Sequence, residues 1–157
     1  MAKHASEHEM HHYLQFALMI ALSFVTMYAF MYAMVDKWVD VKLSLGQLYM
    51  AGLMTAPMVL LELVLMRGMY KNANLNRAIF AGGILLLIGT WIGIRTEAGV
   101  GDRQFLRSMI PHHSGAIQMC TRSSITDREI RDLCKSITEG QQREIDQMNA
   151  ILARLDR

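Results

Sequence analysis

The side chains best suited to chemistry lie in one short run, Met109-Ile-Pro-His-His-Ser-Gly-Ala-Ile-Gln-Met119. Imidazoles and thioethers of this kind are ligands that soft metal ions prefer. At about 100° per residue of α-helix, the four candidate ligands fall within an arc of about 120°; they are Met109, His112, His113 and Met119. The same side of the helix holds Phe105, Leu106, Ala116 and Cys120. We therefore expect all four ligands in the buried stripe of an amphipathic helix.

Two helices are needed to position these ligands. Asp102, after a glycine-containing linker over residues 97–101, is a good N-cap for the helix that carries the run. Residues 123–127 then break the pattern. Thr126 and Glu129 form a capping box that predicts the start of a second, long helix.

The second helix has a seam of residues at alternating spacings of four and three, as in a helical bundle: Ile130, Cys134, Ile137, Gln141, Glu144, Met148, Ile151 and Leu155. A short turn predicts an antiparallel hairpin. Its simplest register sets Met119 opposite Ile130, His112 opposite Ile137 and Met109 opposite Gln141. Gln141 and Glu144 are the polar members of the seam, so they are candidate outer-shell or direct oxygen ligands.

Pro111 leaves two alternatives for the first tail helix. Inside the helix it removes one backbone hydrogen bond and should kink the axis. As a helix start it would separate residues 102–109 into their own turn, and Met109 would no longer share a face with the histidines.

The tail resembles the domain-of-unknown-function family 305, which includes copper-binding CopM-like proteins of bacterial periplasms. Two blocks carry the resemblance, Asp102-x-x-Phe105-x-x-x-Met109-Ile-Pro-His112-His113-x-x-Ala116-x-x-Met119 and Gln141-Gln142-x-Glu144-Ile145-x-x-Met148. The resemblance covers about residues 102–155. It implies a ferritin-like helical bundle in the periplasm that binds copper for tolerance or trafficking. The implied metal ligands are Met109, His112, His113 and Met119, with Met148 next.

Copper is the expected ion, because thioethers favour Cu(I) and imidazole accepts Cu(I) or Cu(II). Zinc or a di-iron site fits less well, since di-iron bundles use several carboxylates and this seam offers one per hairpin. Cys120 and Cys134 fall on inner faces near the turn. They are open to three interpretations: a disulfide between the helices, buried thiols, or additional copper ligands.

A partner is implied for the hairpin, because roughly 55 residues in two helices cannot cover their own apolar stripes. We expect a homodimer, or a higher even oligomer, in which two hairpins form a four-helix bundle. The histidine pairs would then meet near the two-fold axis. Other copper-handling membrane or periplasmic proteins are further candidate partners.

The first half of the 157-residue chain is that of a membrane protein, and the charged residues lie mostly near the C-terminal end. Three apolar runs, at about 13–35, 45–66 and 78–94, are long enough to cross a bilayer of roughly 30 Å. We read the first as a transmembrane helix in preference to a cleaved signal peptide. The predicted domains are a His-containing segment at 1–12, a membrane domain at 13–96 and a metal-binding hairpin at 97–157.

The loops predict the orientation. Arg67, Lys71 and Arg77 lie in the second connection with no acid among them, which places this loop in the cytoplasm. The N-terminus is then cytoplasmic too, and the tail lies in the periplasm of a bacterial inner-membrane protein. Arg95, beside the third span, argues mildly for the opposite orientation.

Several membrane-half residues have both a functional and a plain interpretation. His4, His8, His11 and His12 could hold a metal ion or simply form a solvated entry to the first span. Methionines facing the tail could relay Cu(I) or serve as apolar filler: Met27, Met31, Met34, Met50 and Met54. Glu62 marks a function or a paired polar group. Gly89 and Gly93 permit close helix contact.

We expect a copper-binding protein and not an enzyme, because no nucleophile with an oriented base and no phosphate loop is present in the sequence. The alternatives are a periplasmic copper redox enzyme, which would oxidise or reduce copper at the histidines, and a metal-free assembly module. The net charge of +2 is spread over loops and a mixed-sign tail, so we expect no nucleic-acid partner.

Overall fold

The computed structural model describes residues 2–157, with side chains described from Met10 onward. The regular elements in this range are all helices, which confirms the all-α prediction. Contacts divide the chain into a span unit, residues 2–30 and 48–98, and a hairpin unit, residues 31–47 and 99–157. The connection over 31–47 thus groups with the hairpin, whereas the sequence suggested a hairpin domain confined to 97–157.

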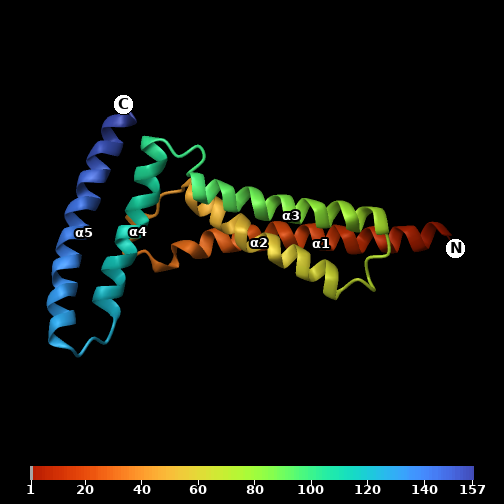
Figure 1. Ribbon diagram of the computed structural model, residues 1–157, viewed down its shortest axis with the longest axis horizontal. Coiled ribbons are helices and arrows are strands. Elements are labelled where there is room, and N and C mark those ends of the chain that lie inside the picture. The colour runs from red at the N-terminus through yellow and green to blue at the C-terminus, as the bar shows by residue number, and fades with distance from the viewer. Residues whose placement is uncertain (1) are drawn as a thin grey trace. The chain divides into compact units, whose positions relative to one another are not determined.

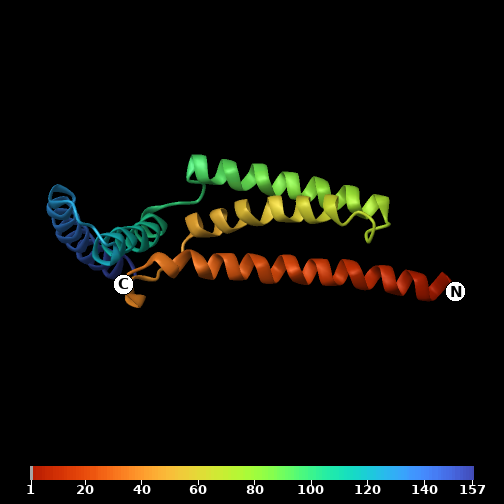
Figure 2. The same ribbon diagram turned by 90° about the horizontal axis from the view of Figure 1, so that it is seen from below.

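The span unit consists of α1 (Ala2–Phe30), most of α2 (Leu45–Leu65) and α3 (Ala73–Thr96), which run side by side in alternating directions (Figures 1 and 2). Three helical stretches are long and apolar enough to cross a membrane: Met10–Met34, Leu45–Leu65 and Ala73–Thr96. The prediction of three candidate spans is confirmed.

The third helix is longer than its apolar run. It begins at Ala73 and not near residue 78, because the Asn72 side chain accepts hydrogen bonds from the backbone N–H groups of Asn74 and Leu75. It continues to Thr96, where Glu97 takes a left-handed conformation with φ of 49°. The polar first turns are therefore helical, and α3 extends beyond the apolar run predicted at about 78–94.

An aromatic and polar cluster joins the three helices at the end where α2 gives way to α3. Tyr13 and Phe16 of α1 pack with Val59, Leu63 and Tyr70. The Tyr13 hydroxyl donates to Asn76 Oδ1 at 2.7 Å and accepts from the Asn72 N–H at 3.1 Å. Buried polar groups need such partners. The hydrogen bonds of Tyr13 therefore hold the turn between α2 and α3 against α1, in addition to the apolar contacts.

Glu62 is a paired polar group. Its Oε1 accepts a hydrogen bond of 3.3 Å from the hydroxyl of Tyr70, which lies in the connection between α2 and α3. Burial, and then the neighbouring Glu62 carboxylate, raise the pKa of Tyr70 above its ordinary value. The hydroxyl therefore keeps its proton and remains a donor to Glu62.

Glycines allow α2 and α3 to approach closely. A side-chain carbon added at Gly52 would lie 2.7 Å from Thr90 Cγ2, and one added at Gly93 would lie 3.0 Å from the Tyr49 ring. A carbon added at Gly89 would meet nothing within 4 Å. Of the two glycines in the predicted contact motif, only Gly93 serves the α2 and α3 contact.

The hairpin unit contains η1 (Met31–Met34), η2 (Trp38–Asp40), α4 (Asp102–Arg122) and α5 (Arg128–Leu155), and α4 and α5 form an antiparallel pair (Figure 1). Both predicted caps are displaced by one residue. Gly101 is the N-cap of α4, without a side-chain bond, and Asp102 lies in the first turn. At α5 the Asp127 carboxylate, and not Thr126, accepts from the Ile130 N–H.

The hairpin has a small core between its helices. Leu106, Ile110 and Ile117 of α4 pack against a set on α5 that comprises Ile145, Met148 and Leu152. Ile145 and Leu152 are absent from the seam predicted from the sequence, and the predicted member Ile130 is exposed. The contact surface of α5 is therefore rotated from the expected seam.

The connection over residues 31–47 covers a second side of α4. The Ser114 hydroxyl donates to Asp40 Oδ2 at 2.8 Å and accepts from the Asp36 N–H at 3.0 Å. Further along, Gln104 Oε1 accepts from the Leu45 N–H at 3.1 Å. Ser114 and Asp40 are both buried, so this connection is an integral part of the hairpin unit.

Candidate metal centre

The helix α4 passes through Pro111 without interruption. The alternative in which Pro111 starts the helix is therefore wrong, and Met109 shares one helix with both histidines. Pro111 is fully buried. Because proline has no backbone N–H, the helix loses one hydrogen bond at this position. The apolar ring is suited to the buried site.

His113 is held from both sides of its ring. Its Nδ1 lies 2.9 Å from the backbone carbonyl oxygen of Met109, one turn earlier on α4. Its Nε2 lies 2.8 Å from Oε2 of Glu144 on α5. The His113 side chain is 11% exposed and that of Glu144 is 58% exposed, so the pair lies at the solvent edge of the helix contact.

These contacts assign the two ring nitrogens. A carbonyl oxygen only accepts, so we assign the hydrogen to Nδ1 of His113. The lone pair of Nε2 then faces a carboxylate oxygen, and one cation must lie between them for both to be satisfied. The 2.8 Å between Nε2 and Oε2 is a hydrogen-bond distance, at which a hydrogen lies between the two atoms. A metal ion bound by Nε2 and the carboxylate would serve the same purpose, with the carbonyl orienting the ring.

Two of the predicted thioethers lie in the core beside this pair. Met148 of α5 is buried in the core of the hairpin, and Met109 of α4 is partly buried and packs against the same core. Gln141, one turn before Glu144, has a buried Oε1 with no hydrogen-bond partner among the described residues. An oxygen in this position is costly unless a cation or water satisfies it.

His112 and Met119 do not lie in the buried stripe. His112 is exposed, and Met119 is 70% exposed. Phe105, at 54% exposed, lies on the same line along α4 because the three residues follow at seven-residue intervals. We call Phe105, His112 and Met119 the exposed stripe. Within the single chain the four predicted ligands therefore do not share a buried face, because α5 and residues 31–47 cover the other two sides of α4.

Met34, one of the methionines that the sequence placed towards the tail, comes close to α4. A side-chain carbon at Gly115 would lie 3.4 Å from the Met34 carbonyl oxygen and 3.6 Å from its sulfur. Gly115 lies between His112 and Met119 in the sequence and is buried. The absence of a side chain at Gly115 therefore brings a further thioether to the helix that carries the exposed stripe.

The register of the hairpin differs from the predicted one by more than a helical turn. Cys120 pairs with Cys134, and His113 pairs with Glu144, whereas the sequence suggested His112 opposite Ile137. Ser123 and Asp127 are extended, with ψ of 141° and 134°. An extended residue advances about 3.3 Å, against 1.5 Å in a helix, so α5 begins beyond the end of α4 and its first turn overhangs.

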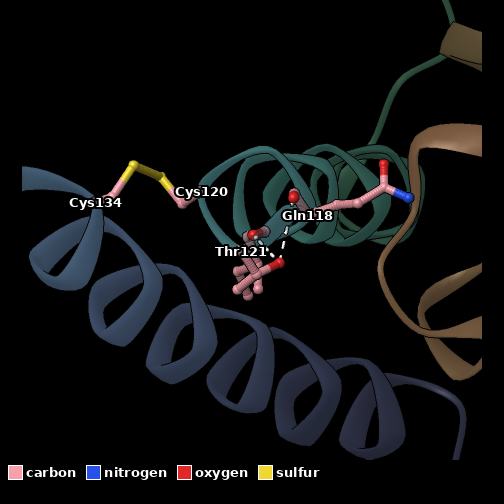
Figure 3. The surroundings of a disulfide bond; sticks show 5 residues. Gln118, Cys120, Thr121 and Cys134 are labelled. Atoms are coloured by element: carbon pink, nitrogen blue, oxygen red, sulfur yellow. Dashed lines mark hydrogen bonds between the residues drawn. A yellow bond between two sulfur atoms is a disulfide. The ribbon is translucent and has the colours of Figure 1, made fainter. Parts of the chain in front are cut away.

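Cys120 and Cys134 form a disulfide between α4 and α5 (Figure 3). Their Cα atoms are 5.2 Å apart, which is an ordinary distance for a disulfide. On the same turn the Thr121 hydroxyl donates to the carbonyl oxygens of Ile117 and Gln118. Of the three interpretations of these cysteines, the structure has the disulfide, in which neither sulfur is a thiolate ligand.

The N-terminal histidines are described only in part. His4 and His8 have side chains outside the described residues, and His11 is exposed. Across the described residues, no group of three or more His, Cys, Asp or Glu side chains is arranged to hold a metal ion. The His113 and Glu144 pair could therefore offer two donors to a metal ion, and a complete site would need further donors from thioethers, Gln141 or a second chain.

Comparison with known proteins extends beyond the hairpin. The family model described as "Domain of unknown function (DUF305)" matches residues 50–152, which include most of α2 and all of α3. The chain is also similar to "Uncharacterized protein L153" of Acanthamoeba polyphaga mimivirus, with 35% identity over 115 residues that cover 72% of this chain and 74% of the relative. No solved structure matches the chain.

Proposed function

The chain belongs to the DUF305 family, and from that premise we propose that it is a membrane-anchored protein that binds copper for tolerance, storage or trafficking. The observation that carries the proposal is the pairing of His113 Nε2 with the Glu144 carboxylate at 2.8 Å. An oriented imidazole beside an anionic oxygen, at the edge of a core containing two methionines, is a donor set that copper accepts.

Each donor has a defined part in this proposal. His113 provides the Nε2 lone pair, and Glu144 provides negative charge that offsets the charge of the ion. Met109 and Met148 provide soft sulfur, which favours Cu(I) over zinc. The unsatisfied Oε1 of Gln141 supports the same assignment, since it is a buried acceptor that a bound cation would satisfy.

A second copy of the chain is the partner that best completes this set. The exposed stripe is apolar apart from His112, and its seven-residue repeat is that of a helix contact. Pairing two such stripes would form a four-helix bundle and bring His112 and Met119 of each copy towards the other copy's site. Copper would then be bound between two hairpins.

The hairpin lies outside the cytoplasm in this proposal, in the periplasm if the cell is a bacterium. Two observations support it. The connection between α2 and α3 carries Arg67, Lys71 and Arg77, which favours a cytoplasmic location for this connection. A disulfide between Cys120 and Cys134 favours an oxidising compartment for the hairpin.

The test is a measurement of bound copper and Cu(I) affinity in the full-length protein in detergent. We expect His113→Ala to lose most of the bound copper. Glu144→Gln retains the shape and loses the charge, so its affinity should fall about 10- to 100-fold. Asp146→Asn is the matched control, since Asp146 is an exposed acid on α5 that bonds to Gln142.

Equal copper content in wild type and His113→Ala would overturn the site. Loss of copper in Asp146→Asn to the same degree as in Glu144→Gln would show that overall charge, and not this carboxylate, governs binding. Circular dichroism of each variant confirms that the helices remain.

A further inference from the structure

A groove of about 430 Å³ lies at the turn between α2 and α3, in the span unit. Its walls combine apolar side chains with two guanidinium groups: Leu63, Val64, Phe80, Ala81, Arg67 and Arg77, with Asn76. Val64 and Phe80 are 55% and 44% exposed. The groove is therefore amphiphilic, since both apolar side chains and cations line it.

Its position follows from the ends of the helices. The helix α2 ends at Leu65 and α3 begins at Ala73. In a bilayer crossed by both helices, the arginines lie at the level of the lipid headgroups and the apolar walls point along the acyl chains. A ligand of this groove must carry charge at one end and hydrocarbon at the other.

The described side chains that line the groove carry positive charge and no negative charge. Neither Arg67 nor Arg77 forms an ion pair with any side chain described from Met10 onward. Glu62, the acid of α2, accepts from Tyr70 and is not a lining residue. Among the described side chains of α2, the one carboxylate therefore already has a donor.

Arg77 is oriented by the first turn of its own helix. Its Nε donates to the carbonyl oxygen of Ala73 at 3.3 Å, and one terminal nitrogen donates to Asn74 Oδ1. These bonds hold the guanidinium near the N-terminus of α3, where the helix dipole also favours an anion. A planar guanidinium that keeps free N–H groups is well suited to phosphate oxygens.

We propose that this groove binds one anionic phospholipid, with its phosphodiester between Arg67 and Arg77 and one acyl chain along Val64 and Phe80. The charge of the arginines selects an anionic headgroup, and the apolar walls select a lipid over a free phosphate. The site is separate from the proposed copper site and shares no residue with it.

Native mass spectrometry of the full-length protein tests the proposal, because it counts single lipid adducts. Phosphatidylglycerol and phosphatidylcholine with the same acyl chains are offered at equal concentrations. We expect one phosphatidylglycerol adduct to be preferred, and each arginine to contribute about fivefold to this preference. The double variant Arg67→Gln, Arg77→Gln should bind both lipids alike.

Lys71→Gln is the matched control, since Lys71 is an exposed cation in the same connection that does not line the groove. It should keep the preference for phosphatidylglycerol. Equal loss in Lys71→Gln would indicate general surface charge and overturn the site, as would a preference retained in the double variant. Displacement of the lipid by millimolar inorganic phosphate would show an anion site in place of a lipid site.

Discussion

His113 and His112 are equivalent candidates in the sequence, and the neighbours of His113 in the structure distinguish the two. Its imidazole is one of two adjacent histidines, and only this one turns towards α5. The Met109 carbonyl fixes one nitrogen, and Glu144 faces the other. Because His113 has these contacts and His112 is exposed, substitution of His113 should lower copper binding more than substitution of His112 in a single chain.

Ser114, the residue after His113, gives a prediction about stability. Its buried hydroxyl joins the Asp40 carboxylate to the Asp36 N–H. Ser114→Ala leaves both groups without that partner, and we expect the free energy of unfolding to fall by about 1 to 3 kcal/mol. Chemical denaturation of the protein in detergent, followed by circular dichroism, measures the change.

Ser108 provides the control for this experiment. Its hydroxyl oxygen is buried and has no hydrogen-bond partner among the described residues. Ser108→Ala removes an unsatisfied polar atom, so it should be neutral or stabilising. An equal loss of stability in both variants would contradict the role assigned to Ser114.

The pair α4 and α5 depends on one covalent link near its turn. The disulfide joins residues 14 apart in sequence. A closed loop of about 15 residues is expected to stabilise a fold by about 3 kcal/mol through the entropy of the unfolded chain. The double variant Cys120→Ser, Cys134→Ser should unfold at correspondingly lower denaturant concentration.

Reduction provides an independent check on the disulfide. A thiol reductant should destabilise the wild-type protein and leave the double serine variant unchanged. If the reductant shifts both proteins equally, its effect does not come from this bond. The core residues Ile110 and Ile145 lie away from the turn, so the helices should stay paired in native conditions.

Close packing of α2 on α3 gives a second prediction for the helices. In Gly52→Ala the new carbon would lie 2.7 Å from Thr90 Cγ2, which is too short unless a helix shifts. Thr90 is buried and β-branched, so it has little freedom to move. Overpacking of this kind costs about 1 to 3 kcal/mol, measurable as a lower midpoint of thermal unfolding.

Gly89→Ala is the matched control in the same pair of helices. A carbon at Gly89 meets nothing within 4 Å, and alanine is the better helix former. We expect this variant to be as stable as the wild type or slightly more so. A loss equal to that of Gly52→Ala would indicate that Gly89 contacts a second chain.

At the level of the whole chain, one side of α4 in the hairpin unit is left uncovered. Two sides of α4 are covered within the chain, and the exposed stripe is left. We expect the protein to be a dimer in mass photometry, and Phe105→Glu to dissociate it because a charge at this position cannot be buried without a partner.

The dimer prediction has a control of similar chemistry. Val39 is 69% exposed and lies in the connection that covers another side of α4. Val39→Glu should leave the dimer intact. A wild-type monomer that retains copper would contradict the proposal that two hairpins form the site.

The sequence was sufficient for the features that depend on composition and local periodicity. The apolar runs predicted three candidate spans, because a long uncharged segment has few other stable environments. Polar breaks predicted the five main helices. The family resemblance at Met109 to Met119 was supported by a match over residues 50–152. Helix ends were less accurate, since Gly101 and Asp127 took the capping positions.

Tertiary contacts decided which face of each helix is covered. Periodicity gave Met109, His112, His113 and Met119 one common arc, but it could not reveal that residues 31–47 would cover α4 and leave His112 and Met119 exposed. It also could not give the register, which depends on the length of the extended turn. These outcomes depend on contacts between residues distant in sequence, such as Asp40 with Ser114 and His113 with Glu144. Local periodicity in the sequence does not encode contacts of this kind.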